Sequence, residues 1–400
     1  MADVGKPNLK SEISNLKSDT FDQFTRRVMS GEARGGVATL LRVATSAAEP
    51  FYSLAASARN RLFDIGAFRS VRLPRPVISV GNITTGGTGK TPLVRWLAAQ
   101  LHDHGKRVAI LSRGYKATPG TLGDEQLMLD RLLNGPGASN KVSIAANPDR
   151  VAAATALLRD RPETDLFILD DGFQHRRVRR ELDLVVISAT SPFGYGRVLP
   201  RGMLREPLRG LSRASAFVVT HADAADPAAL ERIEREVRRH NPDAPLYRAA
   251  HVQSALRRDG GEVVPLDALR ERAWFAFCGI GDPLAFLNQL QSAGGRRAGF
   301  HAFPDHYNYT PDDVATLKRD AAAAGADVLV TTEKDWAKLS RLPVARETDG
   351  AVPIWRADVE LQFMADDAAR LWDQVLRVAS PTAASWPDEG YGRAGRSAPG

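Results

Sequence analysis

Cysteine is almost absent from this 400-residue chain, which holds only Cys278. One cysteine cannot form an internal disulfide and no cysteine pair is present to hold zinc, so a reducing compartment fits the chain. Long apolar runs are lacking too: no stretch of about 18 apolar residues occurs, and a conventional membrane-spanning helix is not expected. Residues 1–36 are polar with alternating charge, which gives no indication of a secretory signal.

Positive charge is in excess, with 54 Lys and Arg against 47 Asp and Glu and a net charge of +7. A basic balance favours anionic partners, whether nucleic acid, phosphorylated metabolites or an acidic membrane surface. No basic strand interleaved with aromatics and no recognition helix is visible, so nucleic acid is not the expected partner. The composition is that of a globular protein, and the length exceeds one ordinary core, which predicts two domains.

Short apolar runs alternate with helical patterns along most of the chain. Runs without polar alternation are typical of strands buried on both faces, so a mainly parallel sheet covered by helices is expected. The first set has strands at 76–81, 107–112, 166–171, 183–188 and 216–221, and helices from about 91, at 124–133 and at 149–159. The second set has strands at 273–278, near 299–302, at 327–332 and near 353–356. Between the sets, two strands joined by Asp259-Gly260-Gly261 indicate a hairpin.

Residues 36–66, GVATLLRVATSAAEPFYSLAASARNRLFDIG, place apolar side chains at near-helical spacing with arginines among them. Pro50 is expected to interrupt this helix or to begin its second half. From the residues alone two interpretations stay open: a basic amphipathic helix can lie in a lipid headgroup layer or can pack on its own domain.

The stretch SVGNITTGGTGKTPLVRW, residues 79–96, has the pattern of a strand, a glycine-rich turn and a helix. Such a turn binds phosphates through its backbone N–H groups, with a Lys on the β and γ phosphates and a Thr hydroxyl on Mg²⁺. The usual first glycine is replaced here by Thr84, although Gly86 and Gly87 preserve the freedom of the turn. The expected nucleotide-binding residues are Thr84, Thr85, Gly86, Gly87, Thr88, Gly89, Lys90 and Thr91.

A Mg-nucleotide site also needs a carboxylate at the end of a neighbouring strand. The stretch LFILDDGFQH supplies Asp170 and Asp171 after four apolar residues, and these two are expected to serve the metal or its waters. Paired acids at a strand end can also form a solvated turn, and that alternative stays open.

Several motifs together resemble one family. They are VGNITTGGTGKTPLV, LSRGY (111–115), GDE (123–125), DDGFQHRRVRRELDLVVI (170–187), FGYGRVLPRGMLREPL (193–208), FCGIGDP (277–283), FPDHY (303–307) and TTEKDWAKL (331–339). Their combination and order are similar to the tetraacyldisaccharide 4'-kinase family, the lipid A 4'-kinases of Gram-negative bacteria. The resemblance covers roughly residues 40–375.

The resemblance implies an ATP- and Mg²⁺-dependent lipid kinase that transfers the γ-phosphate of ATP to the 4'-hydroxyl of tetraacyldisaccharide 1-phosphate, forming lipid IVA in lipid A biosynthesis. It implies a peripheral or monotopic location at the cytoplasmic face of the inner membrane, because the acylated substrate stays in the bilayer. The basic helix at 36–66 then gains a membrane role. No obligate protein partner is evident.

The resemblance also implies roles for single residues. Asp124 matches the family's proposed catalytic base and His306 the histidine that assists it, with Lys90 as the third catalytic group. Without the family, Asp124 would be a helix N-terminal residue and His306 a surface histidine. The implied metal ligands are Thr91, Asp170, Asp171 and Glu125, and weaker candidates for phosphate or substrate are Arg113, Gln174, His175, Arg176, Arg177 and Arg205. The run HRRVRR can equally be a solvated face.

The expected fold class is α/β: a P-loop NTPase-like domain with a mainly parallel sheet, and a second, smaller α/β domain joined by a hairpin-like hinge. The boundaries are a flexible extension at 1–36, a P-loop kinase domain with the amphipathic helix at 37–245, a two-stranded hinge at 246–268, a C-terminal lid domain at 269–377 and a disordered tail at 378–400. If Asp124 and His306 belong to different domains, the catalytic set is complete only when the domains close over ATP.

Two other classes share a GGxGKT turn. A synthetase or amidotransferase-like protein would need a pocket for a carboxylate or amine acceptor instead of an acyl-chain surface. A nucleotide-switched module, of the partitioning or GTPase kind, often has a Lys before the two glycines, where this chain has Thr85.

Overall fold

A computed structural model describes residues 21–114, 123–135, 142–258, 260–305, 307–346 and 352–380. Its α-helices are α2 (Phe21–Ser30), α3 (Gly36–Asp64), α4 (Lys90–Asp103), α5 (Asp124–Asn134), α6 (Arg150–Asp160), α7 (Pro227–His240), α8 (Pro283–Ala293), α9 (Pro311–Ala323), α10 (Glu333–Leu339), α11 (Pro343–Arg346) and α12 (Asp367–Ala379). Its strands are β1 (Val77–Gly81), β2 (Val108–Ser112), β3 (Ser143–Ala146), β4 (Leu166–Asp170), β5 (Leu182–Ser188), β6 (Ala216–Thr220), β7 (Leu246–Arg257), β8 (Val263–Pro265), β9 (Ala273–Cys278), β10 (Arg296–Ala302), β11 (Val328–Thr332) and β12 (Ile354–Phe363).

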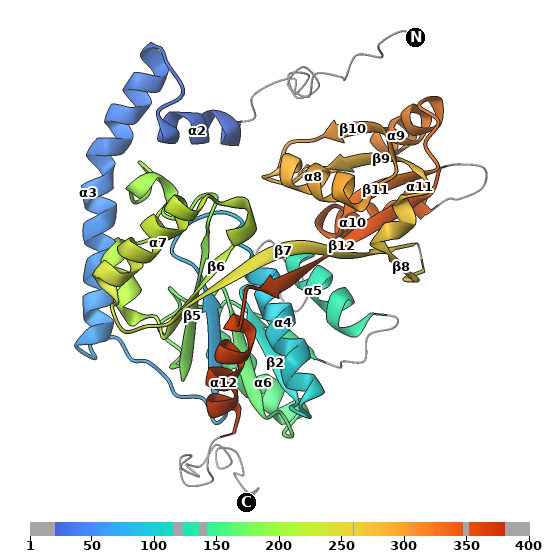
Figure 1. Ribbon diagram of the computed structural model, residues 1–400. Helices are drawn as coiled ribbons and strands as arrows, with labels where there is room; N and C mark the ends of the chain where they lie inside the picture. The colour runs from blue at the N-terminus through green and yellow to red at the C-terminus, as the bar shows by residue number, and fades with distance from the viewer. Residues whose placement is uncertain are drawn as a thin grey trace, which may run out of the picture.

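All the described strands belong to one sheet, in the order β10-β9-β11-β12-β7-β6-β5-β1-β4-β2-β3, with β8 attached to β7 (Figure 1). Only the pairs that β7 makes with β12 and with β8 are antiparallel among the described strands. The expected mainly parallel α/β architecture is therefore confirmed. We call the part of the sheet formed by β1 to β6 the nucleotide half. The part formed by β8 to β11 and the first residues of β12 is called the distal half.

The nucleotide half is covered by helices on both faces, which explains why β1, β2, β5 and β6 are buried along their whole length. Along β4, Leu166 and Ile168 pack with α4, α5 and α12 on one face. Phe167 and Leu169, which alternate with them, pack with α6 on the other face. The distal half repeats this plan, with α8 on one face and α9 and α10 on the other.

Helix α3 is one continuous helix of 29 residues with Pro50 inside it, so the expected interruption at Pro50 is wrong. Most of α3 lies on the outside of the nucleotide half (Figure 1), where water can bond a carbonyl that Pro50 leaves without its usual donor. The expectation of a flexible extension at 1–36 is also wrong for its last part, because Phe21–Ser30 forms α2 and Val28, Ala33 and Ala38 pack together. Among the described residues, no helix is long and apolar enough to cross a membrane.

The chain passes between the two halves through β7 and returns through β12. Strand β7 pairs with β6 at one end and with β12 and β8 at the other, so the expected hairpin at 246–266 is present as β7 and β8. The expected lid at 269–377 differs from the structure at its end. Leu371 and Val375 of α12 lie in the core of the nucleotide half, because the chain crosses back before this amphipathic helix begins.

Candidate active site

The predicted phosphate-binding residues form a loop between β1 and α4. Lys90 and Thr91 are the first two residues of α4, and Gly89 caps the helix in the left-handed conformation with φ of 81°. Gly86 has φ of 115°, which side-chain-bearing residues rarely adopt. The turn therefore needs glycine at two of the predicted positions, and it ends at the N-terminus of α4, where the first amides of a helix favour anions.

The loop is fixed at both ends by neighbouring segments. The Thr85 amide donates to the Met203 carbonyl at 2.7 Å, and Thr84 forms an isolated bridge with Leu204. At the other end the Thr220 hydroxyl, from β6, donates to the Thr88 carbonyl at 2.8 Å. These anchors hold the loop through the amide of Thr85 and the carbonyl of Thr88.

Lys90 and Asp171 meet at the carboxyl edge of the sheet. The Lys90 Nζ lies 3.4 Å from Asp171 Oδ1, and the Arg205 guanidinium contacts both oxygens of the same carboxylate at 3.0 and 2.9 Å. Burial acts to raise the pKa of Asp171, but Lys90 and Arg205 outweigh it and hold that pKa below its usual range. Asp171 is therefore ionised at neutral pH.

Two of the predicted magnesium ligands are Asp170, the last residue of β4, and Thr91, the second residue of α4. Asp170 ends β4, and it is paired in register with Val80 of β1, the strand that leads into the phosphate loop. A carboxylate and a hydroxyl are hard oxygen donors, which Mg²⁺ prefers. No group of three or more His, Cys, Asp or Glu able to hold a metal occurs in the described part of the chain, and a nucleotide-bound Mg²⁺ needs only one or two protein ligands.

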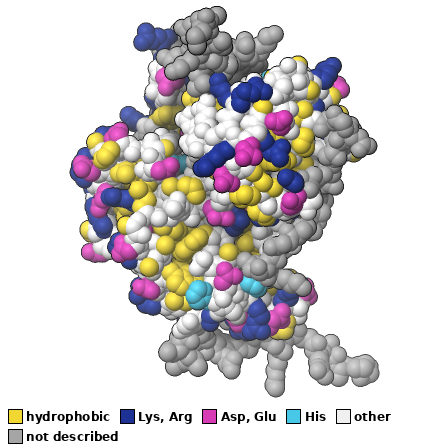
Figure 2. Space-filling view, turned by 45° about the vertical axis from the view of Figure 1, so that its right-hand side comes forward, with side chains coloured by type: hydrophobic (Ala, Val, Ile, Leu, Met, Phe, Trp, Pro, Cys, Tyr) yellow, Lys and Arg dark blue, Asp and Glu magenta, His cyan; other side chains and the backbone are white. Residues whose placement is uncertain are grey.

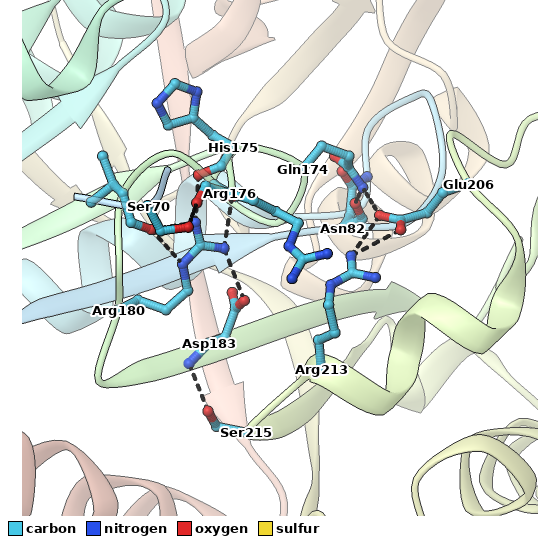
Figure 3. A network of polar contacts seen from close by, with 12 residues as sticks. Ser70, Asn82, Gln174, His175, Arg176, Arg180, Asp183, Glu206, Arg213 and Ser215 are labelled. Atoms are coloured by element: carbon cyan, nitrogen blue, oxygen red, sulfur yellow. Dashed lines mark hydrogen bonds and ion pairs between the residues drawn. The ribbon is translucent and has the colours of Figure 1, made fainter. Parts of the chain in front are cut away.

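Gln174 joins the phosphate loop to the segment that carries Arg205 (Figure 3). Its Nε2 donates to the Asn82 carbonyl at 2.9 Å and to Glu206 Oε1 at 3.1 Å, and its Oε1 accepts from Arg205 at 3.4 Å. With both ends of its amide used inside the protein, Gln174 orients its neighbours.

The turn after Asp171 is held from below by Arg180. Its guanidinium donates to the carbonyls of Gly172, His175 and Val178 and pairs with buried Asp183 at 3.1 Å. In Figure 3 the His175 ring lies on the side of this turn away from Glu206. Burial, helped by nearby arginines, lowers the pKa of His175 to about 4, so this ring is neutral at physiological pH.

The predicted arginines differ in their surroundings. Arg205 lies on Asp171, whereas Arg176 donates to the Asn60 carbonyl at 2.8 Å and pairs with Asp64 of α3 at 2.7 Å. Arg177 pairs with Asp149 at 3.1 Å, and Arg113, just after β2, is exposed. Arg176 therefore ties the turn to α3 and is not directed to a phosphate in this structure.

Asp124 and Glu125 begin α5, and their side chains lie outside the described part of the chain, as does His306 entirely. The two residues around His306 are both held by α10: Lys334 contacts Asp305 at 2.8 Å, and Lys338 donates to the Tyr307 carbonyl at 2.7 Å. The same helix meets α5 where Arg131 donates to the Ser340 hydroxyl at 2.6 Å. The TTEKDWAKL motif, whose chemistry could not be deduced from spacing, thus forms the end of β11 and helix α10, and its lysines contact the residues on either side of His306.

Three residues near the site were not predicted from the sequence: Arg150, His221 and His251. Arg150, at the start of α6, is 3% exposed. Burial lowers the pKa of its guanidinium, and the nearby charges of Asp171 and Asp170 oppose part of this shift. His251 of β7 lies against Gly89, where an added Cβ would come within 2.2 Å of its ring, and its Nδ1 is 2.7 Å from His221 Nε2. None of these residues has a local sequence signal, because each is brought near the phosphate loop by the packing of segments that are far apart in the chain.

Comparisons with known proteins match one family. A sequence model of the tetraacyldisaccharide-1-P 4'-kinase family matches residues 41–379. A tetraacyldisaccharide 4'-kinase of Anaeromyxobacter sp. (strain K) is 39% identical over 350 residues, 83% of this chain and 90% of that protein. One from Halothermothrix orenii is 34% identical over 343 residues, 79% and 87% of the two chains. A crystal structure of LpxK from Aquifex aeolicus in complex with ATP is 30% identical, covers 85% of this chain and 100% of its own, and has a TM-score of 0.64.

Proposed function

Because the chain belongs to the tetraacyldisaccharide-1-P 4'-kinase family, we propose that it transfers the γ-phosphate of ATP to the 4'-hydroxyl of tetraacyldisaccharide 1-phosphate. The product is the bisphosphorylated lipid IVA of lipid A biosynthesis. One observation in this chain carries the proposal most directly: Lys90 opens a helix after a glycine turn and lies 3.4 Å from the Asp171 carboxylate at a strand end. In phosphate-loop enzymes a lysine at this position binds the phosphates of the nucleotide, and an Asp at a neighbouring strand end serves the metal.

The phosphate loop would hold the triphosphate. The amides from Gly86 to Thr91 and the N-terminus of α4 favour anionic oxygens, and Lys90 is placed to neutralise the β and γ phosphates. Thr91 and Asp170 fit Mg²⁺, with Asp171 and Glu125 able to bind its waters. When bound, Mg²⁺ supplies further neutralisation of charge on the phosphates.

Asp124 would orient the sugar hydroxyl and accept its proton late in the reaction, because an aspartate with a pKa of about 4 is a weak base at neutral pH. His306 would tune that carboxylate through a hydrogen bond. Arg205, held on Asp171, and Arg113, which is exposed, are the arginines with access to phosphate groups of the nucleotide or of the lipid.

Helix α3 would bring the enzyme to the lipid. Its exposed side chains include the apolar Val37, Leu40, Leu41, Val43, Phe51 and Leu54, between 39% and 77% exposed, which helical spacing places on one side. The sequence interpretations of α3, as a lipid-facing or a domain-packed helix, are compatible, because its other side contacts the nucleotide half. On the face in Figure 2, basic and acidic side chains are interspersed, so this face has no continuous basic surface of the kind that binds nucleic acid. We propose a peripheral location at the cytoplasmic face of the inner membrane, where ATP is available.

The function is tested by incubating the purified protein with Mg-ATP and tetraacyldisaccharide 1-phosphate in detergent micelles. Mass spectrometry should find a product heavier by one phosphoryl group, and NMR should place the new phosphate at the 4' position. Asp124→Ala should abolish most of this transfer while leaving Mg-ATP binding in place. A wild-type protein that binds ATP but phosphorylates no 4'-hydroxyl would overturn the proposal.

A further inference from the structure

A buried carboxylate lies behind the Asp171–Arg205 pair. Glu206 is 2% exposed, and both of its oxygens accept from Arg213 at 2.9 Å. Two neutral donors complete its shell: Asn60 Nδ2 at 2.6 Å and Gln174 Nε2 at 3.1 Å, the latter visible in Figure 3. A buried charge persists only when its hydrogen bonds are satisfied, so these partners are required together.

The partners of Glu206 come from different segments. Asn60 belongs to α3, Gln174 to the turn after β4, and Arg213 to the short helix after Pro207. Gly210 allows this close packing, because an added Cβ there would come within 2.6 Å of the carboxylate. Glu206 therefore fixes α3 relative to the turn that carries Asp171.

Helix α3 makes further bonds to the same two active-site segments. The Tyr52 hydroxyl donates to the Arg205 carbonyl at 3.0 Å, and Arg59 donates to the Gln174 carbonyl at 2.6 Å. These bonds lie on the protein side of the helix, whereas Leu40, Phe51 and Leu54 are exposed. One helix thus has an apolar face without a protein partner among the described residues and a polar face bonded to the site.

The contacts continue from Glu206 to the phosphate loop. Gln174 connects Glu206 with Arg205 and with the Asn82 carbonyl, and Arg205 holds Asp171, which contacts Lys90. Each step is a direct contact of 3.4 Å or less between two side chains or between a side chain and the backbone, and Glu206, which joins Asn60 to Gln174, is buried. A shift of α3 would therefore displace Gln174 and Arg205.

We propose that Asn60 and Glu206 are positioning residues that link the seat of the lipid-facing helix α3 to the placement of Arg205, Asp171 and Lys90. The inference rests on the proposed function, and it adds that α3 is part of the catalytic geometry as well as an anchor. Removing the Asn60 amide takes one hydrogen-bond donor from Glu206. The free energy lost is that of one hydrogen bond to a charged group. We expect Asn60→Ala to lower kcat about tenfold, with the KM for the lipid unchanged.

The test compares Asn60→Ala, Glu206→Gln and the double variant with Ser57→Ala, a control on the same helix whose hydroxyl donates within α3 to the Ser53 carbonyl. Three quantities are measured for each: kcat and KM in micelles, the Kd of Mg-ATP, and co-sedimentation with vesicles of phosphatidylethanolamine and phosphatidylglycerol. Melting temperatures identify variants that fail to fold, and Asn60→Ala keeps the test informative if Glu206→Gln is one of them.

The inference predicts a lower kcat and a several-fold weaker Mg-ATP affinity for Asn60→Ala, normal vesicle binding, and little further loss when Asn60→Ala is added to Glu206→Gln. Ser57→Ala should match wild type. Wild-type kcat in Asn60→Ala, or a loss of activity that follows a loss of vesicle binding, would overturn it. If the wild type transfers no phosphate, the proposed function fails. The inference is then decided by Mg-ATP affinity, and it falls if Asn60→Ala and Ser57→Ala bind equally.

Discussion

Lys90 is paired with Asp171 at 3.4 Å, and in the proposed function its charge also neutralises the triphosphate. Replacing it by Met keeps the length of the side chain and removes the charge. We expect Lys90→Met to lower kcat/KM by about 100-fold or more, because preorganised charges of this kind stabilise the transferring group. Steady-state kinetics measure the effect, and an unchanged melting temperature is the control. Activity within a few-fold of wild type would remove Lys90 from the site.

His251 is expected to make stability sensitive to acid. Burial, with a smaller effect from His221, lowers the pKa of His251 to about 3, so the folded protein holds this ring neutral. Below the ordinary pKa of about 6.5 the unfolded chain binds a proton that the folded chain does not, and the free energy of unfolding falls as pH falls. Between pH 7 and pH 5 His251 should account for a loss of about 2 kcal/mol.

Urea unfolding at pH 7 and pH 5 tests this effect by comparing wild type with His251→Asn, which has no titrating ring. The variant should lose less stability between the two pH values. An equal loss in both proteins would mean that His251 titrates normally in the folded state.

At the scale of residues, the sequence was informative where the chemistry is local. The loop from Thr84 to Thr91 was recognisable because its glycines, lysine and threonine are consecutive. Glu206 and His251 were not, since each is an ordinary residue whose role arises partly from distant neighbours: Asn60 is 146 residues from Glu206, and His221 is 30 residues from His251. The roles of Asp124 and His306 stay predictions.

Helix α3 is the element whose surface is hardest to explain without a lipid. Burying Leu40 and Leu54 in a headgroup layer would each contribute about 2 kcal/mol. We expect the double variant Leu40→Asp/Leu54→Asp to bind vesicles of phosphatidylethanolamine and phosphatidylglycerol more than tenfold more weakly, as measured by co-sedimentation. Ser46→Asp, an exposed polar position of α3, is the matched control and should bind nearly as wild type.

Undiminished vesicle binding by the double variant would show that another surface binds lipid.

The amphipathic pattern of α3 could be predicted from the sequence, but its continuity through Pro50 could not. That continuity depends on the exposed position of the helix, where the proline leaves no buried carbonyl unsatisfied.

At the scale of the molecule, the two halves share one sheet, and β7 and β12 cross between them. Closure of the distal half over ATP stays a prediction. It can be followed by fluorescence energy transfer between dyes on Asp160→Cys in α6 and Asp320→Cys in α9, both exposed. Native Cys278 is fully buried, and burial raises the pKa of its thiol, so it should not be labelled.

Mg-ATP with the lipid substrate should raise the transfer efficiency in this doubly labelled protein, because closure brings the distal half nearer to the nucleotide half that holds the ATP. The nucleotide-free protein is the control. Equal efficiencies with and without both ligands would contradict closure.

The succession of strands and helices along the chain in each half could be predicted from the alternation of apolar runs and helical patterns, but the order of the strands in the sheet was not predicted. The edge strand β3 and the return of α12 to the first core were not predicted. Strand β3 has four half-buried residues, too few for a clear pattern. The partner of α12 is decided by where β12 ends, which depends on a long antiparallel pairing with β7. Long-range pairing of this kind leaves no periodic signal in the sequence.

The central claim is that the loop from Thr84 to Thr91 holds the triphosphate of ATP. A crystal structure with a non-hydrolysable ATP analogue and Mg²⁺ tests it most directly. The account predicts phosphates against the amides of Gly86 to Thr91, with Lys90 Nζ in contact with them and the metal between Thr91 and Asp170. An analogue bound elsewhere, or a loop left empty at saturating analogue, would contradict it.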